Sequence, residues 1–168
     1  VDPMGIARAA YRDLKGEGVR QGGSTITQQY VKQTYLTSEQ TATRKLKEAV
    51  MAVKLEQQIS KEEILTRYLN TAYFGRGAYG VQAASRAWFG HDIAGLDAGE
   101  AAFLAGLLRS PNGADPYAGP KSLKEAERRR KVVLDRMVVE GYVTPKEEKL
   151  LLAVPMNPMD QTVPEAER

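Results

Sequence analysis

The sequence contains no cysteine and a single histidine, His91. Without cysteine, disulfides, thiol nucleophiles and thiolate metal sites are excluded. One histidine leaves almost nothing from which to build a histidine-rich zinc site or a serine–histidine–aspartate triad. Because His91 directly follows a Trp88-Phe89-Gly90 corner, we expect it to be structural.

Long apolar runs and strand patterns are missing as well. No run approaches the roughly 20 residues that span a bilayer, and there is neither a secretory signal peptide nor an initial Met. We therefore expect the chain to be an interior portion of a longer protein. No alternating strand pattern of useful length, internal repeat or low-complexity tract occurs.

What is present is a helical pattern over 168 residues, with 42% hydrophobic and 27% charged residues. This composition is typical of one soluble globular domain with a hydrophobic core. The net charge of +3 suits an anionic partner but does not distinguish lipid from nucleic acid. The predicted fold class is mostly α.

Periodicity and capping residues predict the positions of the helices and the end of the domain. From Pro155 onward, prolines and acidic residues predict a linker. The sequence therefore predicts a domain over residues 1–154, followed by a linker or the start of another segment over residues 155–168. The expected helices lie at about residues 3–14, 24–36, 41–59, 61–73, 97–108 and 123–140, with shorter ones ending near 89 and starting near 145. The helix over residues 97–108 is apolar on all sides, which predicts that it is buried.

A glycine pair precedes a run of small polar residues, Gly23-Ser24-Thr25-Ile26-Thr27-Gln28-Gln29, with Lys32 one turn further on. Paired glycines let a backbone approach a ligand closely, and a helix N-terminus favours anions. The hydroxyls and amides can supply the neutral hydrogen bonds that sugar hydroxyls require. The alternative is a glycine turn with an ordinary N-cap, which is the commoner use of such residues.

The next motif is Arg44-Lys45-Leu46-Lys47-Glu48. On a helix, Leu46, Ala49, Val50 and Val53 form one apolar stripe, and Glu48 lies on a second side, one turn from Arg44. We expect both sides of this helix to be covered by other parts of the protein. A half-buried carboxylate beside an arginine is a candidate functional group. A surface ion pair is the alternative.

Two further segments are long but less distinctive. Residues 61–75 form an amphipathic helix with an aromatic end, in which Asn70 is expected to be buried and to hold a loop by hydrogen bonds. The basic run Arg128-Arg129-Arg130-Lys131 is either a solvated helix face or a group that neutralises phosphate.

Together these segments resemble the peptidoglycan glycosyltransferases of family 51, which occur in class A penicillin-binding proteins and monofunctional transglycosylases. The residues from Gly23 through Lys32 match the second motif of that family, and those from Arg44 to Glu48 match the third, RKxxE. Residues 61–75 match the fourth motif, and residues 129–134 match the fifth, RRxxVL. The first motif, EDxxFxxHxG, is absent from the printed sequence, Gln33 replaces the usual Asn, and Gln40 stands where relatives often carry Arg.

The resemblance implies a lysozyme-like, N-terminally truncated α-helical domain on the outer face of the cytoplasmic membrane, with a transmembrane anchor upstream. It implies an enzyme that polymerises lipid II into β-1,4 glycan strands and releases undecaprenyl pyrophosphate. The first motif supplies the glutamate thought to act as general base, so the chain as printed is expected to be inactive. A transpeptidase domain is an expected companion in the parent chain.

The resemblance also assigns roles to individual residues. Glu48 is implied to be catalytic, by orienting the pyrophosphate or by binding a divalent cation, Mg or Mn. Gly23 and Asn70 are implied to be structural, and the region from Tyr30 to Leu36, through Tyr30, Val31, Tyr35 and Leu36, to contact the membrane surface. Substrate binding falls to Ser24, Thr25, Gln28, Gln29, Lys32, Arg44, Lys45, Arg129 and Arg130.

Three alternatives remain open from the sequence. A lysozyme-like glycan hydrolase would need an acid carboxyl and room for water but no basic cluster. A non-catalytic module that binds the lipid-linked precursor, or scaffolds partners, fits the missing first motif. A helical nucleic-acid binder rests on charge alone, and we expect no nucleic-acid partner.

Overall fold

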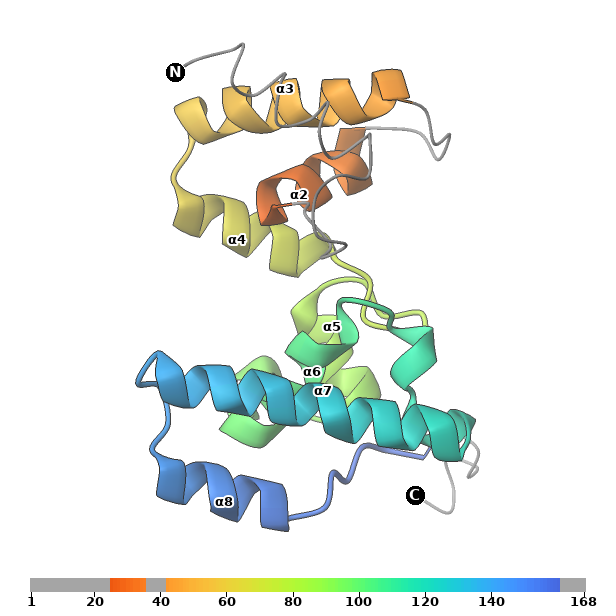
Figure 1. Cartoon of the computed structure of the whole chain (residues 1–168). Coiled ribbons are helices and arrows are strands. Elements are labelled where there is room, and N and C mark those ends of the chain that lie inside the picture. Colours follow the sequence, from red (N-terminus) through yellow and green to blue (C-terminus); the bar gives the residue numbers. More distant parts are fainter. Residues whose placement is uncertain (1–24, 36–41, 161–168) are drawn as a thin grey trace. The chain divides into compact units, whose positions relative to one another are not determined.

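The computed structural model describes residues 25–35 and 42–160, and the chain forms two compact units, Val1–Thr71 and Ala72–Arg168 (Figure 1). Within the described residues the regular elements are helices, with one isolated antiparallel bridge between Tyr73 and Tyr79 and no β-strand. The predicted mostly α fold class is confirmed. None of the described helices is long and apolar enough to cross a membrane.

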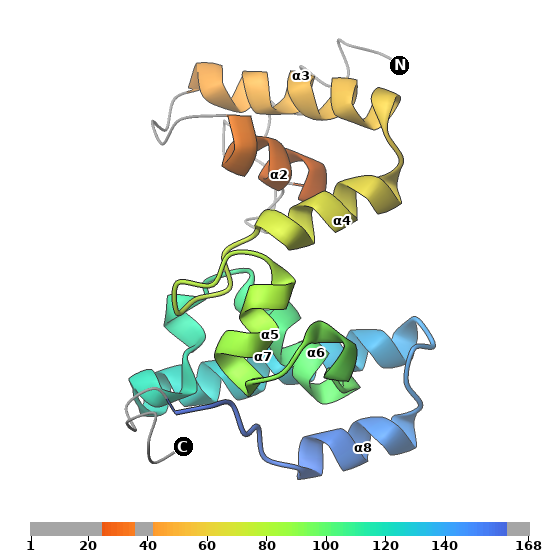
Figure 2. The same ribbon diagram turned by 180° about the vertical axis from the view of Figure 1, so that it is seen from behind.

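The described part of the first unit consists of α2 (Ile26–Tyr35), α3 (Ala42–Gln58) and α4 (Lys61–Thr71). In both views α2 lies between α3 and α4, and it packs against each of them (Figures 1 and 2). These bounds agree with the predicted helices to within two residues at each end. The helix predicted over residues 3–14 lies outside the described residues.

All three helices contribute to the core of the first unit. The side of α3 that faces this core is not the apolar side that the sequence predicted. Glu48 is buried at 2% exposure, whereas Leu46 and Val50 of the predicted apolar stripe are 50% and 46% exposed. At 100° per residue, Glu48 and Ala52 share one side of the helix and Val50 lies on the other. The prediction that Leu46 and Val50 lie on a covered side is therefore wrong. Among the described residues of this unit, the buried apolar side chains are Tyr30, Val31, Ala49, Ala52, Ile64 and Tyr68.

The second unit places one buried helix, α6, beneath the long basic helix α7. The all-round apolarity of α6 predicted its burial, which the structure confirms at Ala102, Phe103, Leu104 and Leu107. Reciprocal capping boxes start α6 at Asp97 and α8 at Thr144. The elements are α5 (Val81–Phe89), η1 (Ile93–Gly95), α6 (Ala98–Leu107), η2 (Asn112–Ala114), η3 (Pro116–Ala118), α7 (Pro120–Val139) and α8 (Pro145–Ala153).

After α8 the chain returns along the second unit. The Met159 amide donates to the Trp88 carbonyl at 2.6 Å, and the Tyr117 hydroxyl donates to the Pro158 carbonyl at 2.9 Å. Residues 155–160 therefore pack with the folded unit, although prolines and acids predicted a linker there. The rest of that segment, residues 161–168, lies outside the described residues.

Arg76 organises the start of the second unit. Its guanidinium lies 3.8 Å from the centroid of the Trp88 ring and forms two hydrogen bonds with the Asp115 carboxylate, at 3.1 and 2.9 Å. It also donates to the Met159 carbonyl. Although burial opposes the change, these hydrogen bonds and one from the Tyr117 amide lower the pKa of Asp115. Arg76 thereby connects the end of the fourth motif to the returning segment.

Candidate functional site

The α2 helix begins at a reciprocal cap. Thr25 Oγ1 accepts a hydrogen bond from the Gln28 amide at 3.1 Å, and Gln28 Oε1 accepts one from the Thr25 amide at 3.3 Å. Two residues predicted to bind substrate therefore also hold the start of their own helix. Gly23 and Ser24, the other predicted residues here, lie outside the described residues.

The following residues of α2 are held by its two neighbouring helices. Thr27 is buried, and its Oγ1 donates to Glu56 Oε1 of α3 at 2.6 Å. On the other side, the Tyr68 hydroxyl of α4 donates to Gln29 Oε1 at 3.0 Å. The second motif is thus fixed by polar contacts to both α3 and α4.

A buried carboxylate between two cations forms the centre of the candidate site on α3. Glu48 Oε2 lies 2.9 Å from Lys45 Nζ, and Glu48 Oε1 lies 3.4 Å from Arg44 Nε. The side chain of Glu48 is 2% exposed, that of Arg44 14% and that of Lys45 37%. The predicted proximity of Arg44 and Glu48 is confirmed, and the contact is more buried than a surface ion pair.

The charge of this cluster suits an anion. Two cations and one carboxylate leave a net charge of +1, and a charge shielded from water interacts more strongly than one at the surface. Lysine and arginine both donate hydrogen bonds to phosphate oxygens. Lys45 is the most exposed of the three side chains, so it is the group best placed to meet a ligand from solvent.

Lys32 is not joined to this cluster. It lies exposed on α2 and forms no hydrogen bond or ion pair with any described residue. The contacts of α2 reach the second half of α3 instead, where Val31 and Tyr35 line a hollow of about 210 Å³ with Met51, Lys54, Leu55 and Gln58. The convergence of Lys32 with Arg44, Lys45 and Glu48 stays a prediction.

The predicted membrane contact from Tyr30 to Leu36 needs correction. Tyr30 and Val31 are 5% and 1% exposed, because helical periodicity places them with Thr27 on the side of α2 that faces the core. Tyr35 is 52% exposed and touches Tyr30 edge to face, with ring centroids 6.3 Å apart. Leu36 lies outside the described residues.

The expected burial of Asn70 is also wrong. Asn70 is exposed near the end of α4, where Ile64 and Tyr68 take the buried side. No described residue forms a hydrogen bond with its side chain. Its predicted role in holding a loop is therefore not supported.

The two arginines of the fifth motif link elements of the second unit. Arg129 Nε donates to Glu125 Oε1 at 2.7 Å, and its Nη1 donates to the Ser110 carbonyl at 3.1 Å. Arg130 is buried and donates to the carbonyls of Gly99, Leu151 and Val154 at 3.2, 2.9 and 3.2 Å. Because backbone acceptors take up its guanidinium, Arg130 is structural, and the prediction that it binds phosphate does not fit. The Nε and Nη1 atoms of Arg129 are likewise hydrogen-bonded within the protein.

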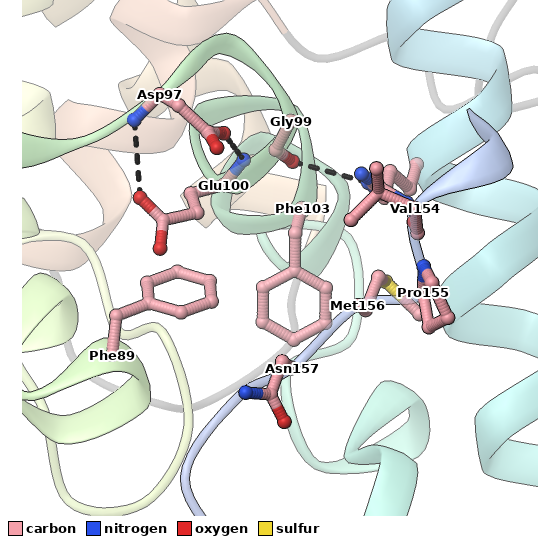
Figure 3. Close-up of a pocket in the computed structure, with 10 residues that line it drawn as sticks. Phe89, Asp97, Gly99, Glu100, Phe103, Val154, Pro155, Met156 and Asn157 are labelled. Atoms are coloured by element: carbon pink, nitrogen blue, oxygen red, sulfur yellow. Dashed lines mark hydrogen bonds between the residues drawn. The ribbon is translucent and has the colours of Figure 1, made fainter. Parts of the chain in front are cut away.

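Gly99 shows how closely α6 approaches Arg130. A Cβ atom at Gly99 would lie 2.7 Å from Arg130 Nη2, so a side chain here would displace the guanidinium. The second unit also contains a pocket of about 270 Å³ beside this contact (Figure 3). Phe89 and Phe103 line one part of it, with ring centroids 5.7 Å apart. Its charged lining residues, Asp97, Glu100 and Arg130, each already hydrogen-bond within the protein.

Two residues that hold the candidate site were not singled out from the sequence, Glu56 and Tyr68. Helical spacing places Tyr68 one turn after Ile64 on the buried side of α4, which predicts burial of the ring. It does not predict a polar partner on α2, because that contact spans 39 residues of sequence. Likewise, the sequence alone predicts a solvated glutamate at position 56. Its contact with Thr27 is evident only once α2 and α3 are known to pack together.

Comparison with known proteins places these features in a family. A family model described as Transglycosylase matches residues 1–138. Penicillin-binding protein 1A of Aquifex aeolicus is 45% identical over 147 residues, which cover 88% of this chain and 20% of the relative. Penicillin-binding protein 1A of Escherichia coli is 45% identical over 144 residues, covering 86% and 17%.

A solved structure gives the same assignment. The crystal structure of penicillin-binding protein 1A from Haemophilus influenzae matches with a TM-score of 0.55 and 29% identity, over 80% of this chain and 16% of that chain. The chain spans about a fifth of the length of the relatives it matches.

Proposed function

Because this chain belongs to the transglycosylase family, we propose that it is part of a peptidoglycan glycosyltransferase that joins lipid II units into β-1,4 glycan strands. The observation that carries the proposal is the buried Glu48 held between Arg44 and Lys45, on a helix that packs against the second-motif helix. The whole reaction, its substrate and its partners are part of this proposal.

The cluster fits the chemistry at the leaving group. When the glycosidic bond forms, the bond from the donor sugar to the lipid pyrophosphate breaks, and negative charge grows on the departing phosphate. Preorganised cations stabilise such charge more effectively than water does. In this proposal Lys45 and Arg44 meet the pyrophosphate, Glu48 holds their side chains in place, and Lys32 supplies a further cation.

Deprotonation of the acceptor is a separate step. The 4-hydroxyl of the acceptor sugar is a poor nucleophile until a carboxylate takes its proton. Glu48 is poorly suited to this, because it is buried and both of its oxygens face cations. The base in this proposal is the glutamate of the first family motif, which is not in the printed sequence.

A divalent cation was expected at Glu48, and the residues do not favour direct binding there. The two carboxylate oxygens already face Lys45 and Arg44, and the described ranges contain no group of three or more metal-binding side chains. Mg²⁺ commonly binds through substrate phosphates and keeps several waters. The proposed role of Mg or Mn is therefore confined to an ion that arrives with the pyrophosphate, and no step above depends on it.

As part of the same proposal, the reaction takes place at the outer face of the cytoplasmic membrane, and its lipid-linked substrate supports a location at a membrane surface. The relatives that carry the name penicillin-binding protein 1A support a transpeptidase domain in a parent chain as part of the same proposal.

Incubation with lipid II tests the proposal and separates it from the alternatives. The chain, extended upstream by a segment carrying the first family motif, should convert lipid II into glycan strands and release undecaprenyl pyrophosphate. Shortening of preformed glycan would instead support a hydrolase. Binding of lipid II without any product would support a non-catalytic module.

A further inference from the structure

His91, the single histidine of the chain, lies between two hydrogen-bond acceptors in the second unit. Its Nδ1 is 3.1 Å from the backbone carbonyl oxygen of Asp92, and its Nε2 is 3.2 Å from Glu100 Oε1. A carbonyl and a carboxylate accept hydrogen bonds and donate none, whereas a neutral imidazole has one N–H group. Both contacts are therefore hydrogen bonds only when each ring nitrogen carries a proton.

Local packing holds the ring in this position. The ring stacks against Phe89, with centroids 6.1 Å apart and 23° between the planes. A Cβ atom at Gly95 would lie 3.1 Å from His91 Nδ1, so glycine leaves room for the ring. The buried Ser85 hydroxyl donates to the His91 carbonyl at 2.7 Å and fixes the backbone. The ring itself is 38% exposed, so it can exchange its proton with solvent.

The charged groups around this contact favour the protonated ring. They are Glu100 and Asp97 at the start of α6, Asp92 with its partner Arg86 of α5, and Arg130 of α7. Asp92 already pairs with Arg86 at 2.6 Å, and Asp97 interacts with Arg130. The Asp92 carbonyl and then the Glu100 carboxylate raise the pKa of His91 above its ordinary value, although desolvation opposes the change.

The same glutamate holds the start of α6. Glu100 Oε2 accepts a hydrogen bond from the Asp97 amide at 3.0 Å, and Asp97 Oδ1 accepts one from the Glu100 amide at 2.7 Å (Figure 3). One oxygen of this carboxylate therefore holds the helix cap and the other holds His91. In the same turn, the Gly99 carbonyl accepts a hydrogen bond from Arg130 of the fifth motif.

We propose that His91 is a pH-sensitive switch whose proton ties the segment after α5 to the start of α6, and whose deprotonation releases one ring contact and loosens the α6 cap. The folded chain holds this proton more tightly than the unfolded chain does. The tie therefore adds stability below the ordinary histidine pKa, about 6.5, and this gain is lost as pH rises through the raised pKa. The pocket of about 270 Å³ shares Phe89, Asp97 and Glu100 with this contact, so its lining is less constrained above that pH.

NMR titration of the full chain tests the switch, because a single histidine gives a single set of imidazole signals. We expect a midpoint above about 6.5 for His91. Glu100→Gln keeps an acceptor for the cap but removes the charge, so the midpoint should fall by roughly a few tenths of a pH unit. Glu147→Gln, at the same position of the capping box of α8, is the matched control and should leave the midpoint unchanged.

Amide hydrogen exchange measures the effect on the helix. Protection of the Glu100 and Ala101 amides, corrected for the intrinsic effect of pH on exchange, should fall roughly two- to fivefold, the scale of one exposed ion pair. The fall should have the midpoint of the His91 titration. His91→Gln is neutral at every pH, so its protection should show no step there.

Three outcomes would overturn the switch. A wild-type midpoint at or below the ordinary value, or one unchanged in Glu100→Gln, would show that the contact does not hold the proton. Constant protection of the α6 start across the His91 titration would show that the proton does not act on the cap. A step that persists in His91→Gln would assign it to another group. All of these measurements are made without lipid II, so the switch can fail while the proposed function stands.

Discussion

Lys45 Nζ lies 2.9 Å from Glu48 Oε2, one turn away on α3, and the carboxylate is buried while the lysine is partly exposed. The buried Glu48 carboxylate thus holds the ammonium group of Lys45, which is accessible to solvent. Glu48 is 2% exposed on a helix whose Leu46 and Val50 face outward, an arrangement that packing alone does not favour. We interpret this pair as a phosphate-binding lysine, Lys45, whose side chain is held in position by Glu48.

Lys45→Ala should raise KM for lipid II about tenfold, because a cation that contacts phosphate is lost. The same change leaves Glu48 with one cation, so the free energy of unfolding should fall by about 1–3 kcal/mol. Lys47→Ala on the exposed side of α3 is the matched control, and it should change neither quantity. Steady-state kinetics and urea unfolding measure both. Equal kinetics for the two variants would remove Lys45 from the site.

Lys32→Ala should weaken use of the pyrophosphate-linked donor without loss of stability. Lys32 is exposed and forms no hydrogen bond or ion pair with a described residue, so its removal should cost little stability. The expected loss in kcat/KM is roughly tenfold, the scale of one charge-assisted hydrogen bond. Unchanged donor kinetics would show that Lys32 does not join the cluster on α3.

Arg130→Met should act on stability. The substitution leaves the carbonyls of Gly99, Leu151 and Val154 without their donor, which should cost about 2–4 kcal/mol in the free energy of unfolding. Arg128→Met, at an exposed arginine two residues earlier, should cost much less. Urea unfolding compares them. A loss of lipid II affinity in Arg130→Met at unchanged stability would restore Arg130 as a phosphate ligand.

The contact between α7 and α8 predicts a dependence of stability on pH. A hydrogen bond with the Asp135 carboxyl, together with burial, raises the pKa of Glu148, while Lys131 and then Glu148 lower the pKa of Asp135. A folded chain that holds the Glu148 proton more tightly gains stability below the ordinary pKa of glutamate. That gain is lost as pH rises through the raised pKa.

Glu148→Gln keeps a hydrogen-bond donor at every pH, so at pH 7 it should melt at a higher temperature than the wild type. The difference should shrink as the pH falls below about 4, where Glu148 is protonated in both states. Thermal melts across this range measure it, with the exposed Glu127→Gln as control. A constant difference at all pH values would contradict the raised pKa of Glu148.

The helices were predictable because the signals that set them are local. Ser60, Asp97 and Thr144 each accept a hydrogen bond from the amide three residues later, as their spacing predicts. The all-round apolarity of α6 likewise predicted its burial. The motif residues Arg44 and Glu48 were found together because one helical turn separates them.

The predictions that failed depend on which side of a helix meets its neighbour. Val50 and Glu48 lie on opposite sides of α3, and apolarity alone favoured burial of Val50. Tyr30 and Val31 are apolar whether they face a membrane or a core, so only the position of α4 and α3 decides between them. The sequence contains no indication of the three carbonyl groups that bind Arg130, because two of them lie more than 20 residues later in the chain.

The most direct test of the central claim is the kinetics of Glu48→Gln on lipid II, in the chain extended by the first family motif, with the exposed Glu62→Gln as control. If Glu48 orients Arg44 and Lys45 at the departing pyrophosphate, kcat should fall roughly 100-fold, the scale seen when one preorganised electrostatic group is removed. KM should not rise, because the substitution removes a negative charge from the phosphate site. A kcat for Glu48→Gln close to that of the wild type and of Glu62→Gln would contradict the account.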